Sequence, residues 1–398
     1  MIDQSRQSTA AGAEPFAELA RKIVVLITED WFALSHFQPL IAVLREFARE
    51  VVIVTRCSGR QEELAALGVR IVDFDYRRTA RNPLRETQSA WTLARILEAE
   101  APDAVHMIAM KPVVLGSLAL KLVPTRHAVL HLPGLGLLSF SSKPVHRLYR
   151  AAALRVIGSA LRKPSSYLLV ENTDDLELLR SGGADPGPRF AILGGTGIDP
   201  DVFPVLPPPR HEVPVAAFVG RMIRAKGVDT LMEAYDRLRQ RGESLTLALY
   251  GKGDEGSNEA IPADVLTAWC EKRGARWHGH VDDVREVWRQ ADIFVLPARG
   301  GDGMPRAMVE AAACARPLVV TDVPGCRHFV RDGVEGYVVP PDDPPALADA
   351  LRRLALDADL RLRMGEAARL RLLQGFTVAH VQTTLRAAYQ SLLDRPRS

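Results

Sequence analysis

Two acidic residues, Asp302 and Glu310, stand with seven residues between them in the stretch ARGGDGMPRAMVEAAACARP. Glycines on both sides of Asp302 let backbone amides approach a ligand closely. Pro305 suits the first turn of a helix, which would place Glu310 one to two turns inside that helix. One carboxylate in a loop and one on a helix can face a single ligand. This arrangement suits the hydroxyl groups of a sugar and a ribose.

Two cations, Arg221 and Lys226, follow the apolar run VAAFVG and precede Gly227, where a helical pattern begins. Backbone N–H groups and the dipole at a helix N-terminus attract an anion, and Arg and Lys neutralise it without a metal. The combination predicts a diphosphate site at the end of a strand. The alternative is that both cations are ordinary solvated side chains at the start of a helix.

These blocks resemble a known family. The stretches GRMIRAKGVDTLMEAY, LYGKGDEG and DGMPRAMVEAAACARPLVVTDVPGCRHFVRDGVEGYVVPPDD resemble the family 4 retaining glycosyltransferases of the GT-B fold over nearly all of 215–343. In the N-terminal half, TEDWFALSH, HMIAMKP and LHLPGLGLLSF resemble a narrower branch of bacterial enzymes. Those enzymes build lipid-linked oligosaccharides for O-antigen, capsule or glycoprotein glycans. The resemblance implies a UDP-sugar donor, often N-acetylated, and an undecaprenyl-diphosphate-linked acceptor.

The resemblance also implies roles for individual residues. The catalytic set that it implies is Asp302, Arg221, Lys226 and His131. Glu310 would hold the ribose hydroxyls, and Asp302 would hold the donor sugar together with the amides of Gly303 and Met304. The family usually has Glu at the first acid, so the carboxylate of Asp302 reaches less far by one methylene group. A His at a strand end is also a common structural residue, and that alternative stays open for His131.

The other implied contacts fall on two sides of the active site. The donor side comprises Gly220, Arg221, Lys226, Gly251, Gly253, His280, Val281, Gly301, Asp302, Gly303, Met304, Pro305 and Glu310. The acceptor side comprises Ser35, His36, Lys111, Gly134 and Gly136. The nucleobase is expected near 277–281.

Two other patterns in the sequence are weaker. GKGDEG at 251–256 fits G-x-G-x-x-G, but no helical pattern opens at its third glycine, so we interpret it as a turn facing the donor. Asp-x-Asp pairs at 73–75 and 357–359 have the pattern that binds metal in the other glycosyltransferase fold. Neither pair adjoins the predicted diphosphate site. We therefore expect no obligatory metal and no cofactor besides the donor substrate.

The elements that must position these residues alternate along nearly the whole chain. Apolar runs predict strands at 22–28, 51–55, 69–74, 103–108, 127–132, 166–171 and 189–193, and again at 215–220, 245–251, 275–280, 292–297, 317–322 and 336–341. Helical patterns include 39–49, 83–100, 145–161, 228–241, 306–315 and 378–393. The strand runs lack polar alternation, which is typical of parallel sheets covered on both faces.

The fold class predicted is α/β, with two doubly wound Rossmann-like domains facing each other across a cleft, as in GT-B. The proline-rich stretch FPVLPPPRHEVP at 203–214 marks the boundary. We predict a loose leader over 1–20, an acceptor-binding domain over 21–205 and a nucleotide-sugar domain over 206–375. A C-terminal helix within 376–398 is expected to pack on the first domain, although its pattern alone cannot show this.

Composition excludes several classes of protein. Of 398 residues, 47% are hydrophobic and 25% are charged, which excludes a disordered chain, a collagen and a coiled coil. The polar, acid-containing N-terminus is unlike a secretory signal, and no apolar run is long enough to span a bilayer. Four widely spaced cysteines suit a reducing cytoplasm. A net charge of +3 is too small to predict nucleic-acid binding.

The distribution of charge is less ordinary. No Asp or Glu occurs in 104–170, whereas nine Lys and Arg do. Within 143–164, apolar residues recur at helical spacing beside these cations, and they are Val145, Leu148, Ala152, Val156 and Ala160. This pattern predicts peripheral binding to an anionic membrane surface at the inner face of the plasma membrane. The alternative is a core helix whose apolar stripe faces the sheet, and both can hold together.

The function predicted is therefore a retaining hexosyl transfer from a UDP-sugar to a lipid-diphosphate-linked glycan. Two rivals belong to other classes. A UDP-sugar 2-epimerase shares the two-domain architecture, although the sequence blocks above are not its pattern. A nucleotide-sugar-binding protein without catalysis is conceivable because Asp302 is shortened.

Overall fold

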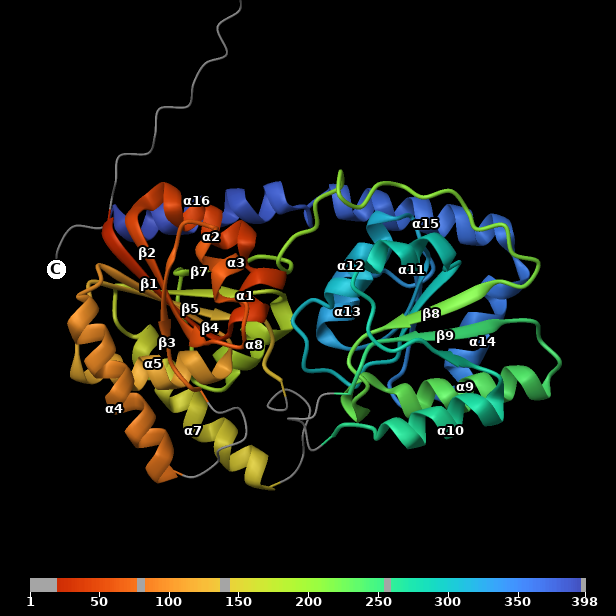
Figure 1. The fold of residues 1–398 in the computed structure, drawn as a ribbon, viewed down its shortest axis with the longest axis horizontal. Coiled ribbons are helices and arrows are strands. Elements are labelled where there is room, and N and C mark those ends of the chain that lie inside the picture. Colours follow the sequence, from red (N-terminus) through yellow and green to blue (C-terminus); the bar gives the residue numbers. More distant parts are fainter. Residues whose placement is uncertain (1–19, 77–82, 137–143, 254–258, 395–398) are drawn as a thin grey trace, which may run out of the picture.

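A computed structural model describes residues 20–76, 83–136, 144–253 and 259–394. The predicted leader therefore lies outside the described residues except for Ala20, which begins the first strand. Two parallel sheets, each flanked by helices, lie side by side along the long axis of the molecule (Figure 1). The α/β, GT-B-like architecture predicted from the sequence is confirmed.

The first sheet has seven parallel strands in the order β3-β2-β1-β4-β5-β6-β7. Their bounds are β1 Ala20–Glu29, β2 Ala48–Arg56, β3 Arg70–Asp73, β4 Ala104–Ile108, β5 His127–Leu132, β6 Ser166–Val170 and β7 Phe190–Ile192. The order reverses between β1 and β4, and ligands of such sheets bind at this switch point, outside the carboxyl ends of the strands.

The second sheet has six parallel strands in the order β10-β9-β8-β11-β12-β13. Their bounds are β8 Val215–Val219, β9 Thr246–Tyr250, β10 Arg276–Trp277, β11 Ile293–Leu296, β12 Leu318–Thr321 and β13 Gly336–Val339. Here the order reverses between β8 and β11. The residues predicted to bind the diphosphate and the donor sugar follow these two strands.

Helices cover both faces of the first sheet. Those of the first domain are α1 Asp30–His36, α2 Gln38–Phe47, α3 Gln61–Ala65, α4 Pro83–Glu100, α5 Met110–Leu122, α7 Pro144–Leu161 and α8 Thr173–Ser181. Alternate residues of β1 supply two separate cores: Ile23 packs with α2, whereas Val24 packs with α4 and α5. This burial on both faces explains why the strand runs show no polar alternation.

The second domain repeats the arrangement. Its elements are the 3-10 turn η1 Arg224–Lys226, then α9 Val228–Gln240, α10 Ala263–Arg273, α11 Val284–Gln290, α12 Arg306–Ala313, α13 Pro324–Phe329, α14 Pro344–Leu356 and α15 Ala358–Leu373. One continuous core joins these helices to the sheet. Strand β10 is shorter than the predicted run, because only two of its residues pair with β9.

The last helix, α16 (Val378–Leu393), returns to the first domain (Figure 1). Leu385 and Tyr389 are buried in the same core as α2 and β1, and Arg386 forms a bidentate ion pair with Glu46 at 2.6 and 2.7 Å. Where the chain returns, Thr377 pairs with Ile198 in an isolated parallel bridge. The chain therefore crosses between the domains twice, and the two crossings lie side by side.

Candidate functional site

The predicted diphosphate site lies at the C-terminal end of β8. Gly227 has a φ of +69°, and a Cβ added there would lie 1.9 Å from the carbonyl oxygen of Pro297. Only glycine permits this approach, which brings the start of α9 against the end of β11. As a result Lys226 reaches the loop after β11 and forms an ion pair with Asp302. Arg221 is exposed and follows β8 by one residue.

Glu310 lies inside α12, as the position of Pro305 predicted. Glu310 is 6% exposed, and its carboxylate accepts a hydrogen bond from Nε of Arg306 at 2.7 Å, one helical turn away. Burial raises the pKa of Glu310 above its usual value, and the Arg306 guanidinium opposes that effect. The two acids thus stand on one loop–helix unit, and each is paired with a cation.

The loop 300–305, which we call the acid loop, is held by the first domain. The Gly303 amide donates to the carbonyl of Pro133 at 3.1 Å, and the Gly303 carbonyl accepts from Nδ2 of Asn172 at 2.9 Å. The Met304 amide donates to the buried carboxyl group of Glu171. Burial raises the pKa of that carboxyl well above 4.5, and the nearby acids Asp175 and Asp302 raise it further.

Both amides that the resemblance assigns to the donor sugar are thus engaged by the first domain. To contact a sugar, Gly303 and Met304 would have to exchange these partners. Sequence reasoning missed Glu171 and Asn172 altogether. They lie about 130 positions before the loop in the chain, and SYLLVENT reads simply as a strand end followed by a helix start.

Glycines predicted for the acceptor side also contact the acid loop. A Cβ on Gly134 would lie 2.6 Å from both the Gly301 carbonyl oxygen and the Gly303 amide nitrogen. The Gly136 amide donates to the Gly301 carbonyl at 3.1 Å. The first domain therefore meets the acid loop backbone to backbone at this point.

The remaining predicted acceptor residues separate into two places. Ser35 Oγ lies 2.6 Å from Nδ1 of His36 at the end of α1. Burial and the Arg306 guanidinium lower the pKa of His36 to about 4, while Asp302 opposes them, so His36 lies within electrostatic reach of the acid loop. Lys111 instead forms an ion pair with Glu86 of α4 at 3.1 Å.

His131 is 2% exposed at the end of β5, two residues before Pro133. Its Nδ1 lies 3.1 Å from Nε2 of His106 on β4, and the edge of its ring meets Phe37. Burial lowers the pKa of His131 to about 3, so the imidazole is neutral at physiological pH. No signal in the sequence indicated His106 as a partner, because an apolar strand run can carry one His on either face.

The predicted nucleobase region lies where β8, β9 and β10 end together. Trp277 Nε1 donates to the Gly251 carbonyl at 2.9 Å, and the Gly220 amide donates to the backbone carbonyl of Tyr250 at 3.0 Å. Gly253 is half-buried nearby, and residues 254–256 of the GKGDEG turn lie outside the described residues. His280 is exposed, and Val281 packs partly against the core.

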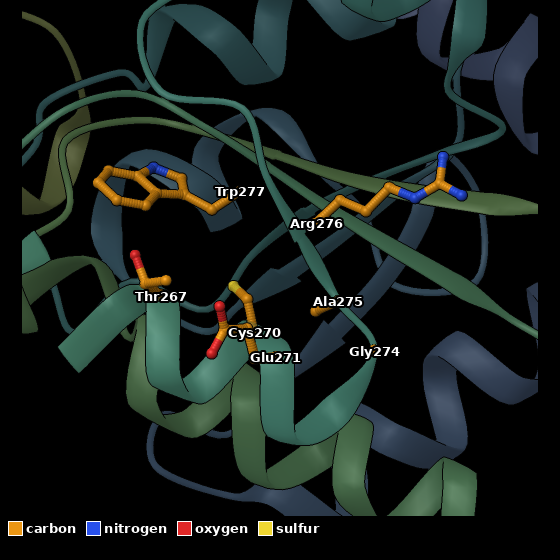
Figure 2. Close-up of a pocket in the computed structure, with 7 residues that line it drawn as sticks. All are labelled: Thr267, Cys270, Glu271, Gly274, Ala275, Arg276 and Trp277. Carbon is orange, nitrogen blue, oxygen red and sulfur yellow. The ribbon is translucent and has the colours of Figure 1, made fainter. Parts of the chain in front are cut away.

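An open groove of about 410 Å³ lies on the outer side of this region, between α10 and the edge strand β10. Its lining residues are Thr267, Cys270, Glu271, Gly274, Ala275, Arg276 and Trp277. In Figure 2 the Trp277 ring faces the groove, whereas the Arg276 side chain extends away from it. Neither Lys226 nor the two acids line this groove, so it is separate from the ion-paired site.

Within the described ranges, no group of three His, Cys, Asp or Glu could hold a metal ion. The Asp-x-Asp pairs have structural contacts: Asp73 accepts from the Cys57 amide at 3.0 Å, and Asp357 caps α15 by accepting from Leu360 at 2.8 Å. Likewise, no helix of the described chain combines the length and hydropathy that crossing a membrane requires.

Two Rossmann-like domains that meet through loops at the C-terminal ends of their parallel strands define a GT-B architecture. Residues 213–357 match the family model described as glycosyl transferases group 1, and residues 22–161 match the one described as glycosyl transferase 4-like. The chain belongs to the GT-B glycosyltransferases of this group, as the sequence blocks predicted.

Individual relatives are consistent with this assignment. The N,N'-diacetylbacillosaminyl-diphospho-undecaprenol alpha-1,3-N-acetylgalactosaminyltransferase of Campylobacter jejuni is 24% identical over 355 residues, which cover 84% of this chain and 90% of that protein. HepE of Anabaena, in complex with UDP-glucose, aligns with a TM-score of 0.73 at 17% identity over 93% of this chain and 99% of its own. Sucrose-phosphate synthase from Thermosynechococcus elongatus aligns with a TM-score of 0.76 at 17% identity, over 94% of this chain and 99% of its own. At these identities the solved structures establish the fold.

Proposed function

We propose that the protein is a retaining, metal-independent glycosyltransferase that moves a sugar from a UDP-sugar to a lipid-diphosphate-linked glycan. The observation that carries this proposal is the ion pair between Lys226, after β8, and Asp302, after β11, with Glu310 in the helix that follows the same loop. A cation for a diphosphate and two acids for sugar hydroxyls therefore stand on adjacent loops. The bound UDP-glucose of HepE and the undecaprenol-linked acceptor named for the Campylobacter relative support the two substrate classes.

The ion pairs of the site suggest how a donor would bind. A diphosphate placed at Arg221 and Lys226 would replace Asp302 as the partner of Lys226. The Asp302 carboxylate would then be available to accept from a sugar hydroxyl. Glu310, which is buried in α12, would similarly accept hydrogen bonds from the ribose hydroxyls. Asp302 thus exchanges its cation for a hydroxyl donor, so its carboxylate keeps a hydrogen-bond partner while Lys226 neutralises the diphosphate.

The chemistry of transfer follows from these charges. On a single face of the sugar, the bond from the anomeric carbon to the diphosphate breaks as the acceptor hydroxyl attacks. The departing diphosphate takes the acceptor proton. Arg221, Lys226 and the start of α9 would stabilise the negative charge that grows on the leaving group, which is usually the largest contribution to such catalysis.

A panel of UDP-sugars tests the proposal, first by thermal shift and then by transfer to polyprenyl-diphosphate-linked glycans. We expect Lys226→Ala and Arg221→Ala to lower turnover roughly a hundredfold, about 3 kcal/mol, while the fold persists. Arg224→Ala is the matched control, because Arg224 lies in the same turn, is exposed and is assigned no substrate contact. A changed sugar without acceptor would indicate an epimerase, and binding without turnover would indicate a binding protein.

We further propose that the first domain binds anionic membranes through α7. The first turns of this helix carry large apolar side chains in solvent, with Val145 59%, Leu148 74% and Tyr149 50% exposed. A different face packs on the sheet: Ile157 and Leu161 belong to the core that also contains α4 and α5, and Ala153 is buried one turn before Ile157. A core role therefore does not account for the predicted stripe at its N-terminal end.

Cations accompany these exposed apolar residues, since Arg147 and Arg155 are exposed on the same helix. Each Lys or Arg near an anionic surface contributes about 1 kcal/mol, so binding should be weak and salt-sensitive. Liposome co-sedimentation should require anionic lipid, and it should fall for Leu148→Ser and for Arg147→Glu with Arg155→Glu. The control is Arg237→Glu with Arg239→Glu, an equal charge reversal on exposed positions of α9. A wild type that ignores anionic liposomes at low salt would overturn this proposal.

A further inference from the structure

A row of three buried polar side chains links the last helix to the candidate active site. The Tyr389 hydroxyl of α16 lies 2.7 Å from Nδ1 of His106, and Nε2 of His106 lies 3.1 Å from Nδ1 of His131. Their side chains are at most 2% exposed. Among the described residues, Nε2 of His131 has no hydrogen-bond partner.

All three groups are neutral at physiological pH. Burial lowers the pKa of His106 well below 6.5, and the neighbouring His131 adds to this, while burial also lowers the pKa of His131 to about 3. Burial raises the pKa of Tyr389 well above 10. A neutral imidazole has one N–H donor and one acceptor nitrogen. The hydrogen bonds of the row can therefore be arranged in two ways. Each donor points either from Tyr389 toward His131 or from His131 toward Tyr389.

The hydroxyl of Tyr389 decides between these two arrangements. His106 is its hydrogen-bond partner in the described structure, and the core of α2, β1 and α16 encloses it. If the hydroxyl accepted from His106, two buried groups would lack a partner, the hydroxyl proton and the Nε2 lone pair of His131, whereas only Nε2–H of His131 lacks one if the hydroxyl donates. If it donates to Nδ1 of His106, then Nε2 of His106 carries a proton and donates to Nδ1 of His131.

We propose that Tyr389 and His106 are positioning residues that hold His131 as the Nε2–H tautomer, so that it presents a hydrogen-bond donor to an uncharged oxygen of the substrate. The inference rests on the proposed function for the identity of that oxygen, a sugar hydroxyl. For the tautomer itself, the inference rests on the geometry of the three side chains alone. The unpartnered nitrogen is then a buried donor that lacks an acceptor in the free protein, and such groups are rare unless a ligand or water completes them.

The location of the nitrogen agrees with this role. His131 ends β5 two residues before Pro133, which accepts from the acid loop, and its ring meets Phe37, the residue after His36. A substrate held by the acid loop would thus lie beside the end of β5. A neutral donor at this place suits a hydroxyl oxygen, because it brings no net charge next to the reacting sugar.

The test is nitrogen NMR of the full-length protein with 15N-labelled histidine, in which the His131 signals are identified by their loss in His131→Gln. In the wild type we expect the Nε2–H tautomer of His131 to exceed the Nδ1–H tautomer roughly fivefold or more. In Tyr389→Phe the hydroxyl that sets the direction is gone, so the two tautomers should become comparable in population. Tyr235→Phe is the control, because it removes a buried hydroxyl that donates to Leu245 at 3.1 Å in the second domain.

A wild type in which His131 carries its proton on Nδ1 would overturn the proposal, and so would Tyr389→Phe that leaves the tautomer unchanged. Loss of the single tautomer in Tyr235→Phe as well would show a general loosening and would also contradict it. None of these readouts requires turnover. A protein that shows the expected tautomer but transfers no sugar would therefore refute the proposed function while leaving this inference standing.

Discussion

Gly303→Ala should detach the acid loop from the first domain. Gly303 lies outside the left-handed region, so alanine is compatible with its backbone, and crowding alone opposes the substitution. The added Cβ would lie 2.6 Å from Oε2 of Glu171 and 2.7 Å from the carbonyl oxygen of Pro133. The Pro133 backbone cannot move aside as a flexible side chain can. The loop must therefore shift instead.

The cost can be worked from the contacts that this shift breaks. The Gly303 amide, the Gly303 carbonyl and the Met304 amide each make one hydrogen bond to the first domain. At about 1 kcal/mol each, the loss is about 3 kcal/mol, which corresponds to roughly a hundredfold in the population of the attached loop. Displacing Asp302 by about 1 Å could lower turnover by a similar factor.

Hydrogen exchange measured by mass spectrometry on peptides covering 300–306 would detect the change, alongside the rate of sugar transfer. We expect exchange in this segment to accelerate roughly a hundredfold, in proportion to the loop's opening. Gly375→Ala is the matched control, because a Cβ there meets nothing within 4 Å and its φ is ordinary. If Gly303→Ala kept both the exchange rate and the turnover of the wild type, the inter-domain attachment would be unimportant and our reasoning wrong.

Three further predictions concern acids and metal. Asp302→Asn should abolish most transfer whereas Asp302→Glu should retain part of it, as measured by product formation; equal activity of both variants and wild type would show that the acid does not contact the donor. EDTA should leave turnover largely intact, and recovery with Mg²⁺ or Mn²⁺ after inhibition would refute this. Burial raises the pKa of Asp175 from 3.8 to about 6, so folding stability should fall by up to about 3 kcal/mol as pH rises through this interval. Chemical denaturation at several pH values should show that the free energy of unfolding of Asp175→Asn changes less with pH than that of the wild type. An unchanged pH dependence would contradict the raised pKa of Asp175.

The strands could be predicted from sequence because their signal is local. Each of the thirteen predicted runs overlaps one strand of the structure, since apolar β-branched runs bounded by turns leave little choice of element. Boundaries were less accurate. The helix predicted over 39–49 ends at Phe47, because β2 already begins at Ala48 and pairs with Ala20.

Contacts between domains could not be predicted in the same way. Nothing in the sequence around Glu171 indicates that this residue meets Met304, because that contact depends on how the two sheets are placed relative to each other. The same limit applied to α16, whose pattern predicted a helix but not its partner. For α7 the periodicity predicted a helix but left open which face packs on the sheet: Leu148 of the predicted stripe is 74% exposed, whereas Ile157, outside that stripe, is buried.

The return of α16 to the first domain has a consequence for synthesis. The ribosome makes β1 to β7 first, yet the core beneath α2 remains open until residues 378–393 have left the exit tunnel, because Leu385, Tyr389 and Leu392 fill it. Domains generally fold as units while the chain grows, from the N-terminus onward. In this protein the first domain must instead wait, with apolar surface uncovered, while the whole second domain is translated. Chaperone demand should therefore be greatest during that interval, and a premature stop before 378 should damage the first domain more than the second.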